Sequence, residues 1–322
     1  MKGTEMKLQK ILVAIKPWQR GLPLAAVHAR QLAQGVGAQI QLVSSVFDAA
    51  VAAGCERGEA KSQTTQKRTL ASARVELERL ARSMRDWGAE VTTRVVWGTP
   101  AYEAILTGAA EWHADLLVVG AHEPETLHTR LTDTDWQLMR RVQCPLLLVK
   151  SASFSGYRTI LAAVDPLHAH DEPFGLDRAV LDAGRSLARA FDSTLRAVYA
   201  YPGEAAFELA SAVQVAPGVL YGAENVAALH RRAVDELAEQ YGIAAAEVDL
   251  VEGAAAEAVI ATVAKRRAEL VVVGTSQRHG LFAAAIGSTA EFIAGEVPCD
   301  VLIVPAAPVE NRTEAGTRSQ VR

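Results

Sequence analysis

The sequence predicts an α/β protein built from two tandem domains, each a doubly wound, Rossmann-like fold around a five-stranded parallel sheet. The first observation is an internal repeat: KILVAIKP at 10–17 matches TILAAVDP at 159–166, and VVWGTPAYEAI at 95–105 matches LVEGAAAEAVI at 250–260. The second is that apolar strands alternate with amphipathic helices in both halves. The third is that the copies are spaced by roughly 150 residues, the usual size of one domain.

Ten strands are expected along the chain. They fall near 10–15, 38–44, 89–96, 115–119 and 145–149 in the first half, and near 159–164, 194–200, 246–251, 269–273 and 300–304 in the second. They are rich in Val, Ile and Leu, which is typical of parallel strands covered on both faces. The clearest helix covers about 64–87, where apolar residues recur at helical spacing: Leu70, Leu77, Leu80, Met84 and Trp87. Right-handed crossovers then give a doubly wound sandwich.

The domain boundaries follow from the same repeat. We expect a first domain over 1–150, a second domain over 157–306, and a polar, disordered tail over 307–322. The short Ser/Gly stretch between the domains comes directly after a strand that ends at Val149. Each half is long enough to bury a core of its own.

Composition and charge argue against two classes of partner. Half of the 322 residues are hydrophobic, yet no apolar run approaches the roughly 18 residues of a membrane helix. No membrane insertion and a cytoplasmic location are therefore expected. Residues 1–150 hold 19 Lys and Arg against 15 Asp and Glu, and residues 151–322 hold 14 against 22, giving net charges of +4 and −8. Neither half has the concentrated basic stripe of a nucleic-acid-binding protein.

The two copies differ most in the loop after their fourth strand. The second loop contains Gly274, Gly280 and Gly287, followed by Ser288 and Thr289, whereas the first has no glycine between residues 120 and 156. A glycine-rich turn that opens a helix lets backbone N–H groups surround a phosphate. A Gly-Ser pair before a helix is also a common N-cap, so the pattern alone leaves both interpretations open.

A ligand site is expected at the carboxyl ends of the second domain's strands. Ligands of doubly wound sheets bind where the strand order reverses, which brings Val164 and Asp165 close to Gly274. Asp165 can accept hydrogen bonds from a base or ribose, and Gly274 allows a ligand to approach the backbone. The helix after Gly287 offers free N–H groups and a partial positive charge to a phosphate.

Over almost the whole chain, to about residue 306, the sequence resembles the universal stress protein (UspA) family, and within it the tandem two-domain members of the UspE type. The family's nucleotide signature is a glycine, two residues, a second glycine, nine residues, and a glycine followed by serine or threonine. Residues 274–288 have that length, with Gln277 in place of the second glycine. The resemblance implies an adenine nucleotide alpha hydrolase-like fold, in which Asp165 contacts the base and Val198 lines the same pocket.

The function that the resemblance implies is a stress response, including resistance to DNA-damaging agents, with ATP or another adenine nucleotide bound by the second domain. Gln277 places a side chain where glycine lets the backbone wrap the phosphates, although Gly280 can supply flexibility nearby. The sequence leaves open whether Gln277 closes the site or reshapes it. No general base is identified, so an enzyme is not predicted, and a weak ATPase stays an alternative.

The first copy departs further from the signature. Lys16 stands in place of the strand-end aspartate, Glu123 in place of the second glycine, and Thr132 or Asp133 in place of the third. The carboxylates of Glu123 and Asp133 would repel phosphate. We therefore expect this copy to be structural, with Asp135 as a helix cap and Trp136 as a packing anchor.

Other ligands and partners are also considered. Segment 202–222 is unusually apolar, which favours a hydrophobic or lipid-like ligand in the second domain as an alternative, and a ligand-free interaction scaffold is a further one. The matching segment 48–66 is polar and expected to be mobile. A cluster at 168–172 (His168, His170, Asp171 and Glu172) lacks a further spaced ligand, so no metal site is predicted.

The resemblance also implies how the two halves meet. Single-domain family members dimerise, often through their last strands, and a tandem chain can make that contact internally through 145–149 and 300–304. Such an internal pseudo-dimer hides two exposed sheet edges. Whether the whole chain forms a further homodimer is left open.

Overall fold

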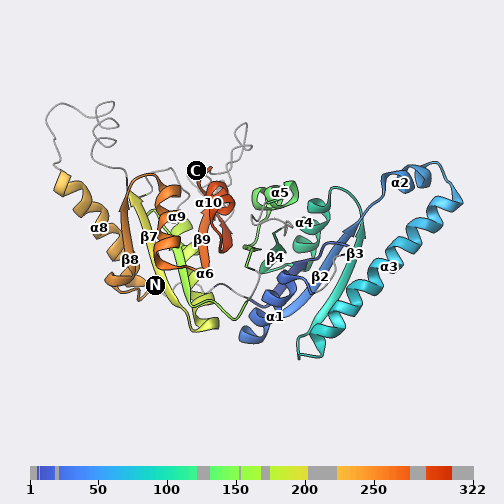
Figure 1. The fold of residues 1–322 in the computed structure, drawn as a ribbon, viewed down its shortest axis with the longest axis horizontal. Coiled ribbons are helices and arrows are strands. Elements are labelled where there is room, and N and C mark those ends of the chain that lie inside the picture. Colours follow the sequence, from blue (N-terminus) through green and yellow to red (C-terminus); the bar gives the residue numbers. More distant parts are fainter. Residues whose placement is uncertain are drawn as a thin grey trace, which may run out of the picture.

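A computed structural model shows one continuous sheet with helices on both faces (Figure 1). It describes residues 6, 8–18, 22–121, 131–151, 154–167, 175–201, 223–275 and 288–306. The strands are β1 (Lys10–Ala14), β2 (Gln39–Val46), β3 (Val91–Trp97), β4 (Leu116–Gly120), β5 (Leu146–Val149), β6 (Thr159–Ala163), β7 (Thr194–Tyr201), β8 (Val248–Glu252), β9 (Leu270–Thr275) and β10 (Asp300–Pro305). All ten predicted strands are confirmed, and each end lies within two residues of its expected position.

The helices fill the gaps between the strands as a doubly wound fold requires. They are α1 (Leu24–Val36), α2 (Ala49–Glu56), α3 (Ala60–Arg85), α4 (Ala101–Trp112) and α5 (Asp133–Arg141) in the first half, and α6 (Leu176–Phe191), α8 (Ala223–Gln240), η1 (Ala245–Glu247), α9 (Ala255–Arg266) and α10 (Ser288–Glu296) in the second. No helix in the described part of the chain is long and apolar enough to cross a membrane.

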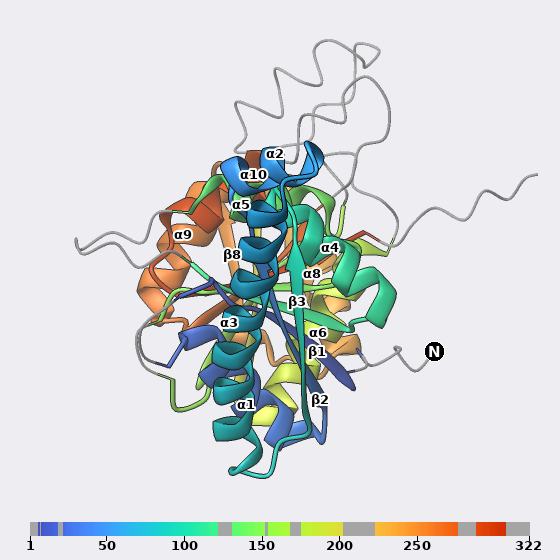
Figure 2. The ribbon, with the colours of Figure 1, turned by 90° about the vertical axis from the view of Figure 1, so that its right-hand side faces the viewer.

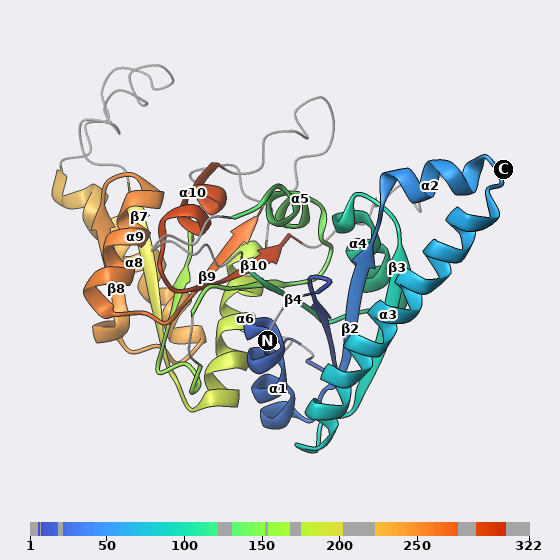
Figure 3. The same cartoon turned by 45° about the vertical axis from the view of Figure 1, so that its right-hand side comes forward.

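The strand order is β3-β2-β1-β4-β5-β10-β9-β6-β7-β8. Read from each outer edge toward the central junction of β5 and β10, the two halves have the same order: β3-β2-β1-β4-β5 and β8-β7-β6-β9-β10. All neighbours within a half are parallel, and β5 and β10 are antiparallel, with Leu147 opposite Leu302. Figure 3 shows β10 between β9 and β4, where the halves meet. The predicted internal pairing through 145–149 and 300–304 is confirmed.

Two hydrophobic layers cover the sheet, and each runs through both halves. One layer packs α1, α3, α6 and α8 against one face, and the other packs α4, α5, α9 and α10 against the opposite face. The long helix α3 lies along the outer edge of the first half, where it faces the viewer in Figure 2. Because both layers contain side chains from both halves, the two domains share their cores.

Segment 48–66 corrects one expectation. The sequence predicts a mobile loop here, but the segment forms α2 and the first turns of α3, which begins about one turn before the predicted helix start at about 64. Asp48 caps α2, because its side chain accepts a hydrogen bond from the N–H of Val51 at 2.9 Å. The alanine-rich run behind that cap has high helix propensity, which outweighs the polar character of the segment.

A buried polar cluster joins the halves beneath the junction. Both oxygens of Asp300 accept hydrogen bonds: Oδ1 from the N–H groups of Lys150 (2.8 Å) and Ser151 (2.9 Å), and Oδ2 from the hydroxyl of Tyr157 (2.8 Å). The Nε2 atom of His28, on α1 of the first half, lies 3.0 Å from Oδ2. His28 and Asp300 are both fully buried. This cluster fixes α1 of one half against the start of β10 of the other.

Candidate functional site

The second domain's switch point begins where β6 ends. Val164 continues the pairing with β7, because its N–H donates a hydrogen bond to the carbonyl of Val198 at 3.0 Å. Val198 is buried within the layer formed by α9 and α10, and Val164 within the opposite layer. Asp165 follows Val164 and is only 9% exposed. Val164, Asp165 and Val198 thus lie at the same carboxyl edge of the sheet, but the side chains of the two valines face opposite helix layers.

Asp165 belongs to a polar cluster that sequence reasoning did not identify. Its backbone N–H donates to Oδ1 of Asp177, a buried residue in the first turn of α6, at 2.8 Å. On the same face of the sheet, the Tyr199 hydroxyl lies 2.6 Å from Nδ1 of His230 on α8, and the ring of Tyr201 stacks on that imidazole. The cluster therefore joins β6, β7, α6 and α8 through buried polar groups.

The charges of this cluster are interdependent. Burial raises the pKa of Tyr199 well above its usual value, and the nearby carboxylates of Asp165 and Asp177 raise it further. Burial lowers the pKa of His230, and the charge of Asp165 opposes that shift. At neutral pH the phenol of Tyr199 therefore stays protonated and can donate a hydrogen bond.

Gly274 lies near the end of β9 and packs closely against α6. A Cβ atom at this position would lie 2.6 Å from Cγ of Leu176, which is much closer than a carbon contact allows. The glycine is therefore required by the packing of α6 on the sheet, independently of any ligand. Its first-domain counterpart, Gly120, has no such crowding, since its nearest neighbour would be Ala25 Cβ at 3.8 Å.

The remaining predicted residues come before α10 in the sequence or in its first turn. The helix begins at Ser288, and Thr289 in its first turn is exposed. Gln277, Gly280 and Gly287 lie outside the described residues, as does the side chain of Ser288. The apolar segment 202–222, the His and acid cluster at 168–172 and the tail from 307 lie outside them as well. Within the described residues, no group of His, Cys, Asp or Glu is arranged to hold a metal.

The first domain holds a cavity of about 580 Å³ at the corresponding switch point. It lies between the carboxyl ends of β1, β2 and β4 and the starts of α4 and α5, with Val43, Gly120 and Thr132 among its walls. The start of α5 is closed by a capping box: Asp135 Oδ2 accepts from the N–H of Thr132 at 2.7 Å, and Thr132 Oγ1 accepts from the N–H of Asp135. The predicted helix cap at Asp135 is confirmed.

This cap makes the first domain's helix start unsuitable for phosphate. Asp133 and Asp135 put carboxylates in the first turn of α5, where they satisfy the helix dipole and repel a further anion. Trp136 packs in the core layer that both halves share, near Gly295 of α10, in agreement with its expected anchoring role. Neither the cavity itself nor its size could be expected from the sequence.

Comparison with known proteins identifies the family. The family model described as "Universal stress protein family" matches residues 7–150 and again residues 156–305. The chain belongs to this family. Its tandem arrangement is shared by the universal stress protein E homolog of Haemophilus influenzae, which is 28% identical over 309 residues, covering 92% of this chain and 97% of that protein. Universal stress protein E of Escherichia coli is 25% identical over 300 residues, covering 92% and 93%.

A solved structure shows the same tandem architecture. The chain is similar to a putative universal stress protein from Pseudomonas aeruginosa, with a TM-score of 0.71 and 25% identity over 94% of this chain and 95% of that one. The family and the tandem fold are therefore established for this universal stress protein, and family membership supports a role in the stress response.

Proposed function

We propose that this chain is a cytoplasmic stress-response protein that binds an adenine nucleotide through its second domain, without catalytic turnover. The observation that carries the proposal is the placement of Asp165. Asp165 lies two residues after the end of β6, and β6 pairs with β9, with Ala162 opposite Val272. Gly274, which begins the segment with the family's glycine spacing, therefore lies at the same edge of the sheet as Asp165.

The groups at this edge suit the parts of a nucleotide. A carboxylate accepts hydrogen bonds from an adenine amino group or from ribose hydroxyls. Val198 supplies apolar surface on the side of the sheet that faces α9 and α10. The first turn of α10, which begins at Ser288, offers backbone N–H groups and the positive end of a helix dipole to a phosphate.

Isothermal titration calorimetry with ATP and ADP tests the proposal on the full chain. We expect saturable binding of one nucleotide per chain, and an affinity at least tenfold lower in Asp165→Asn, because a hydrogen bond to a charged group contributes about 1.5–3 kcal/mol. Asp192→Asn is the matched control, since Asp192 is exposed at the far end of α6. Gln277→Gly restores the family's second glycine and is expected to tighten binding.

Two further measurements separate the alternatives. Phosphate release that stays at background in the presence of ATP supports a binding protein, whereas release that Asp165→Asn abolishes indicates an ATPase. Native mass spectrometry of the purified protein identifies a ligand that stays bound. A co-purified acyl-containing molecule in place of a nucleotide, together with no heat of ATP binding, would overturn the proposal.

A further inference from the structure

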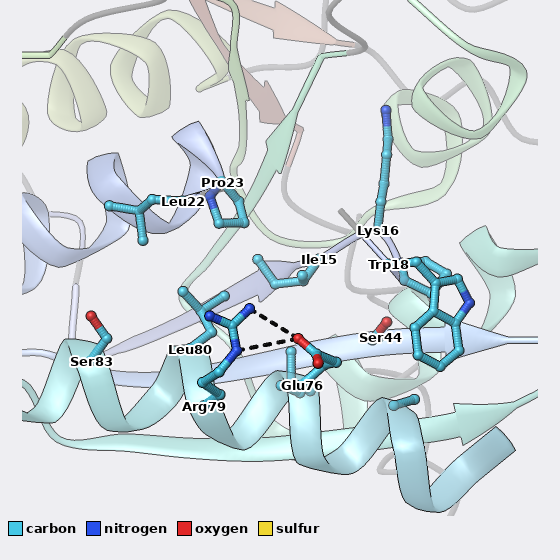
Figure 4. A pocket seen from close by; sticks show the side chains of 13 residues that line it. Ile15, Lys16, Trp18, Leu22, Pro23, Ser44, Glu76, Arg79, Leu80 and Ser83 are labelled. Carbon is cyan, nitrogen blue, oxygen red and sulfur yellow. Dashed lines mark hydrogen bonds and ion pairs between the residues drawn. The ribbon is translucent and has the colours of Figure 1, made fainter. Parts of the chain in front are cut away.

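A second cavity, of about 400 Å³, lies on the other face of the first half of the sheet (Figure 4). Its walls come from the end of β1 and the following turn, from the middle of α3, and from β2, and they are mostly apolar: Ile15, Trp18, Pro23, Leu77 and Leu80, with Ser44. Its volume falls within the range of small-molecule sites, about 300–1,000 Å³.

The cavity lies on the opposite side of β2 from the switch-point cavity, and the two adjoin at the turn after β1, where Ile15, Lys16, Pro17 and Pro23 line both. Successive residues of a strand point to opposite faces of the sheet, and β2 shows this directly: Val43 and Ser45 line the cavity of about 580 Å³, whereas Ser44 lines the second one. The second cavity therefore lies on the side of the sheet that faces α3. The family's glycine loop would lie on the other side, near α4 and α5.

The internal repeat explains why the first half leaves this space open. Val43 pairs with Ala14 as Val198 pairs with Ala163, so Ser44 corresponds to Tyr199, the next residue in each strand. In the second half, the large buried side chain of Tyr199 occupies this position and meets His230. The first half has a small serine instead, and the space that a phenol would occupy becomes cavity.

The helix that faces this strand, α3 in the first half and α8 in the second, also differs between the halves. Counting back eleven residues from Trp87-Gly88 and from Tyr241-Gly242, which follow the ends of α3 and α8, places Glu76 at the position of His230. Glu76 is 52% exposed and pairs with Arg79 on its own helix, at 2.9 Å. The two charges at the rim therefore neutralise each other, and they leave the interior of the cavity to apolar side chains.

Two features of the cavity indicate an occupant. Ser44 is 4% exposed and lines the cavity, and its hydroxyl shares no hydrogen bond with the residues that the structure describes. Its oxygen is not one of the fully enclosed polar atoms without a partner, so it is open to the cavity and can bond to the polar group of a ligand there. At the mouth, Trp18 has a φ of 62°, a conformation unfavourable for a bulky residue, and the residue is 56% exposed beside Ser44 (Figure 4).

We propose that this cavity is a ligand site for a small, neutral, mainly apolar molecule that carries one hydrogen-bonding group. Apolar walls and the Trp18 ring hold the body of the molecule, and Ser44 holds its polar group. Lys16 also lines the cavity, and its side chain extends away from α3 in Figure 4. The site does not depend on nucleotide binding by the second domain.

Fluorescence titration of the full chain with N-phenyl-1-naphthylamine tests the site. This probe is neutral and aromatic, carries a single N–H group, and brightens in apolar surroundings. We expect saturable binding, at least tenfold weaker in Ser44→Tyr, which inserts the side chain found at the equivalent position of the second half. The sulfonated analogue, 8-anilinonaphthalene-1-sulfonate, is expected to bind more weakly, and excess ATP is expected to displace neither probe.

Ser45→Tyr is the matched control, because it makes the same change one residue further along β2, toward the other cavity. Ala73→Leu, on α3, fills the proposed site by a second route and keeps the test valid if Ser44→Tyr does not fold. Weaker binding in Ser44→Tyr and Ala73→Leu but not in Ser45→Tyr supports the site. Unchanged binding in a folded Ser44→Tyr or Ala73→Leu, loss only in Ser45→Tyr, or tighter binding of the sulfonate would overturn it.

Discussion

At the scale of single residues, the strongest expectation concerns Asp300, which holds together groups from both halves. Replacing it with Asn removes the negative charge that Lys150, Ser151, Tyr157 and His28 surround. Removing one partner from a buried charged cluster leaves the others unsatisfied, so we expect Asp300→Asn to lower the free energy of unfolding by about 3 kcal/mol. Urea denaturation followed by circular dichroism measures it.

The matched control is an ion pair at the surface. Glu111 contacts Arg94 at 2.6 Å, but its side chain is 56% exposed. Solvent screening reduces the contribution of such pairs to about 1 kcal/mol or less, so Glu111→Gln should change stability little. Equal effects of the two substitutions would contradict the role given to the buried cluster.

Asp300 also predicts a dependence of stability on acid. Burial acts to raise its pKa, but the contact with His28 and the backbone N–H groups of Lys150 and Ser151 outweigh burial and hold the pKa below the usual 3.8. A carboxyl with a lowered folded-state pKa stabilises the fold above its unfolded-state pKa, and that contribution is lost as pH falls through 3.8 toward the folded value. The difference in stability between wild type and Asp300→Asn should therefore narrow as the pH falls from about 7 toward about 3. A stability difference between the two proteins that stays constant across that pH range would argue against this role of Asp300.

At the scale of secondary-structure elements, the packing of α6 on β9 depends on Gly274. A methyl group there would meet Leu176 at 2.6 Å, so we expect Gly274→Ala to destabilise the protein by about 1–3 kcal/mol. Shortening the opposing side chain in the double variant with Leu176→Ala should recover part of that loss, because the clash disappears. Thermal unfolding of the single and double variants measures the coupling.

Gly120→Ala is the control at the equivalent place in the first half, where the new Cβ would be 3.8 Å from its nearest neighbour. This substitution should be tolerated. If Gly274→Ala is equally stable yet binds nucleotide less well, the glycine serves the ligand rather than the helix packing.

Most elements of the fold could be predicted from the sequence, for a physical reason. Strands such as β4 and β9 are apolar on both faces, and this pattern directly reflects their burial under two helix layers. Segment 48–66 was misjudged because its polar composition obscured the capping signal at Asp48. Helix ends depend on one hydrogen bond, whereas strands depend on a whole run of residues.

The candidate site was less predictable, because it depends on contacts between distant residues. Asp165 could be identified from its place at the end of a strand. Asp177, Tyr199 and His230 could not, since nothing in the linear sequence shows that α6, β7 and α8 bring them to one face of the sheet. The two cavities of the first half likewise arise from the absence of side-chain volume, which only packing shows.

At the scale of the whole molecule, we expect the two domains to unfold as one cooperative unit. Both core layers extend across the antiparallel junction of β5 and β10, and α5 and α10 are further linked by an ion pair between Arg140 and Glu291 at 2.9 Å. Elements that share a core lose its burial together, so one half should not stay folded when the other unfolds.

The distribution of tryptophan makes this cooperativity measurable. All five tryptophans lie in the first half, so their fluorescence reports on that half alone, whereas far-UV circular dichroism reports on both. Met84 is 2% exposed on α3, far from the junction, and Met84→Ala should cost about 2–5 kcal/mol. We expect both signals to share one midpoint in the wild type and to shift together in Met84→Ala, because loss of the first half's core removes the support of the second. A circular dichroism transition that persists after the fluorescence change is complete would mean that the second domain folds on its own, and that the shared layers are contacts between two independent units.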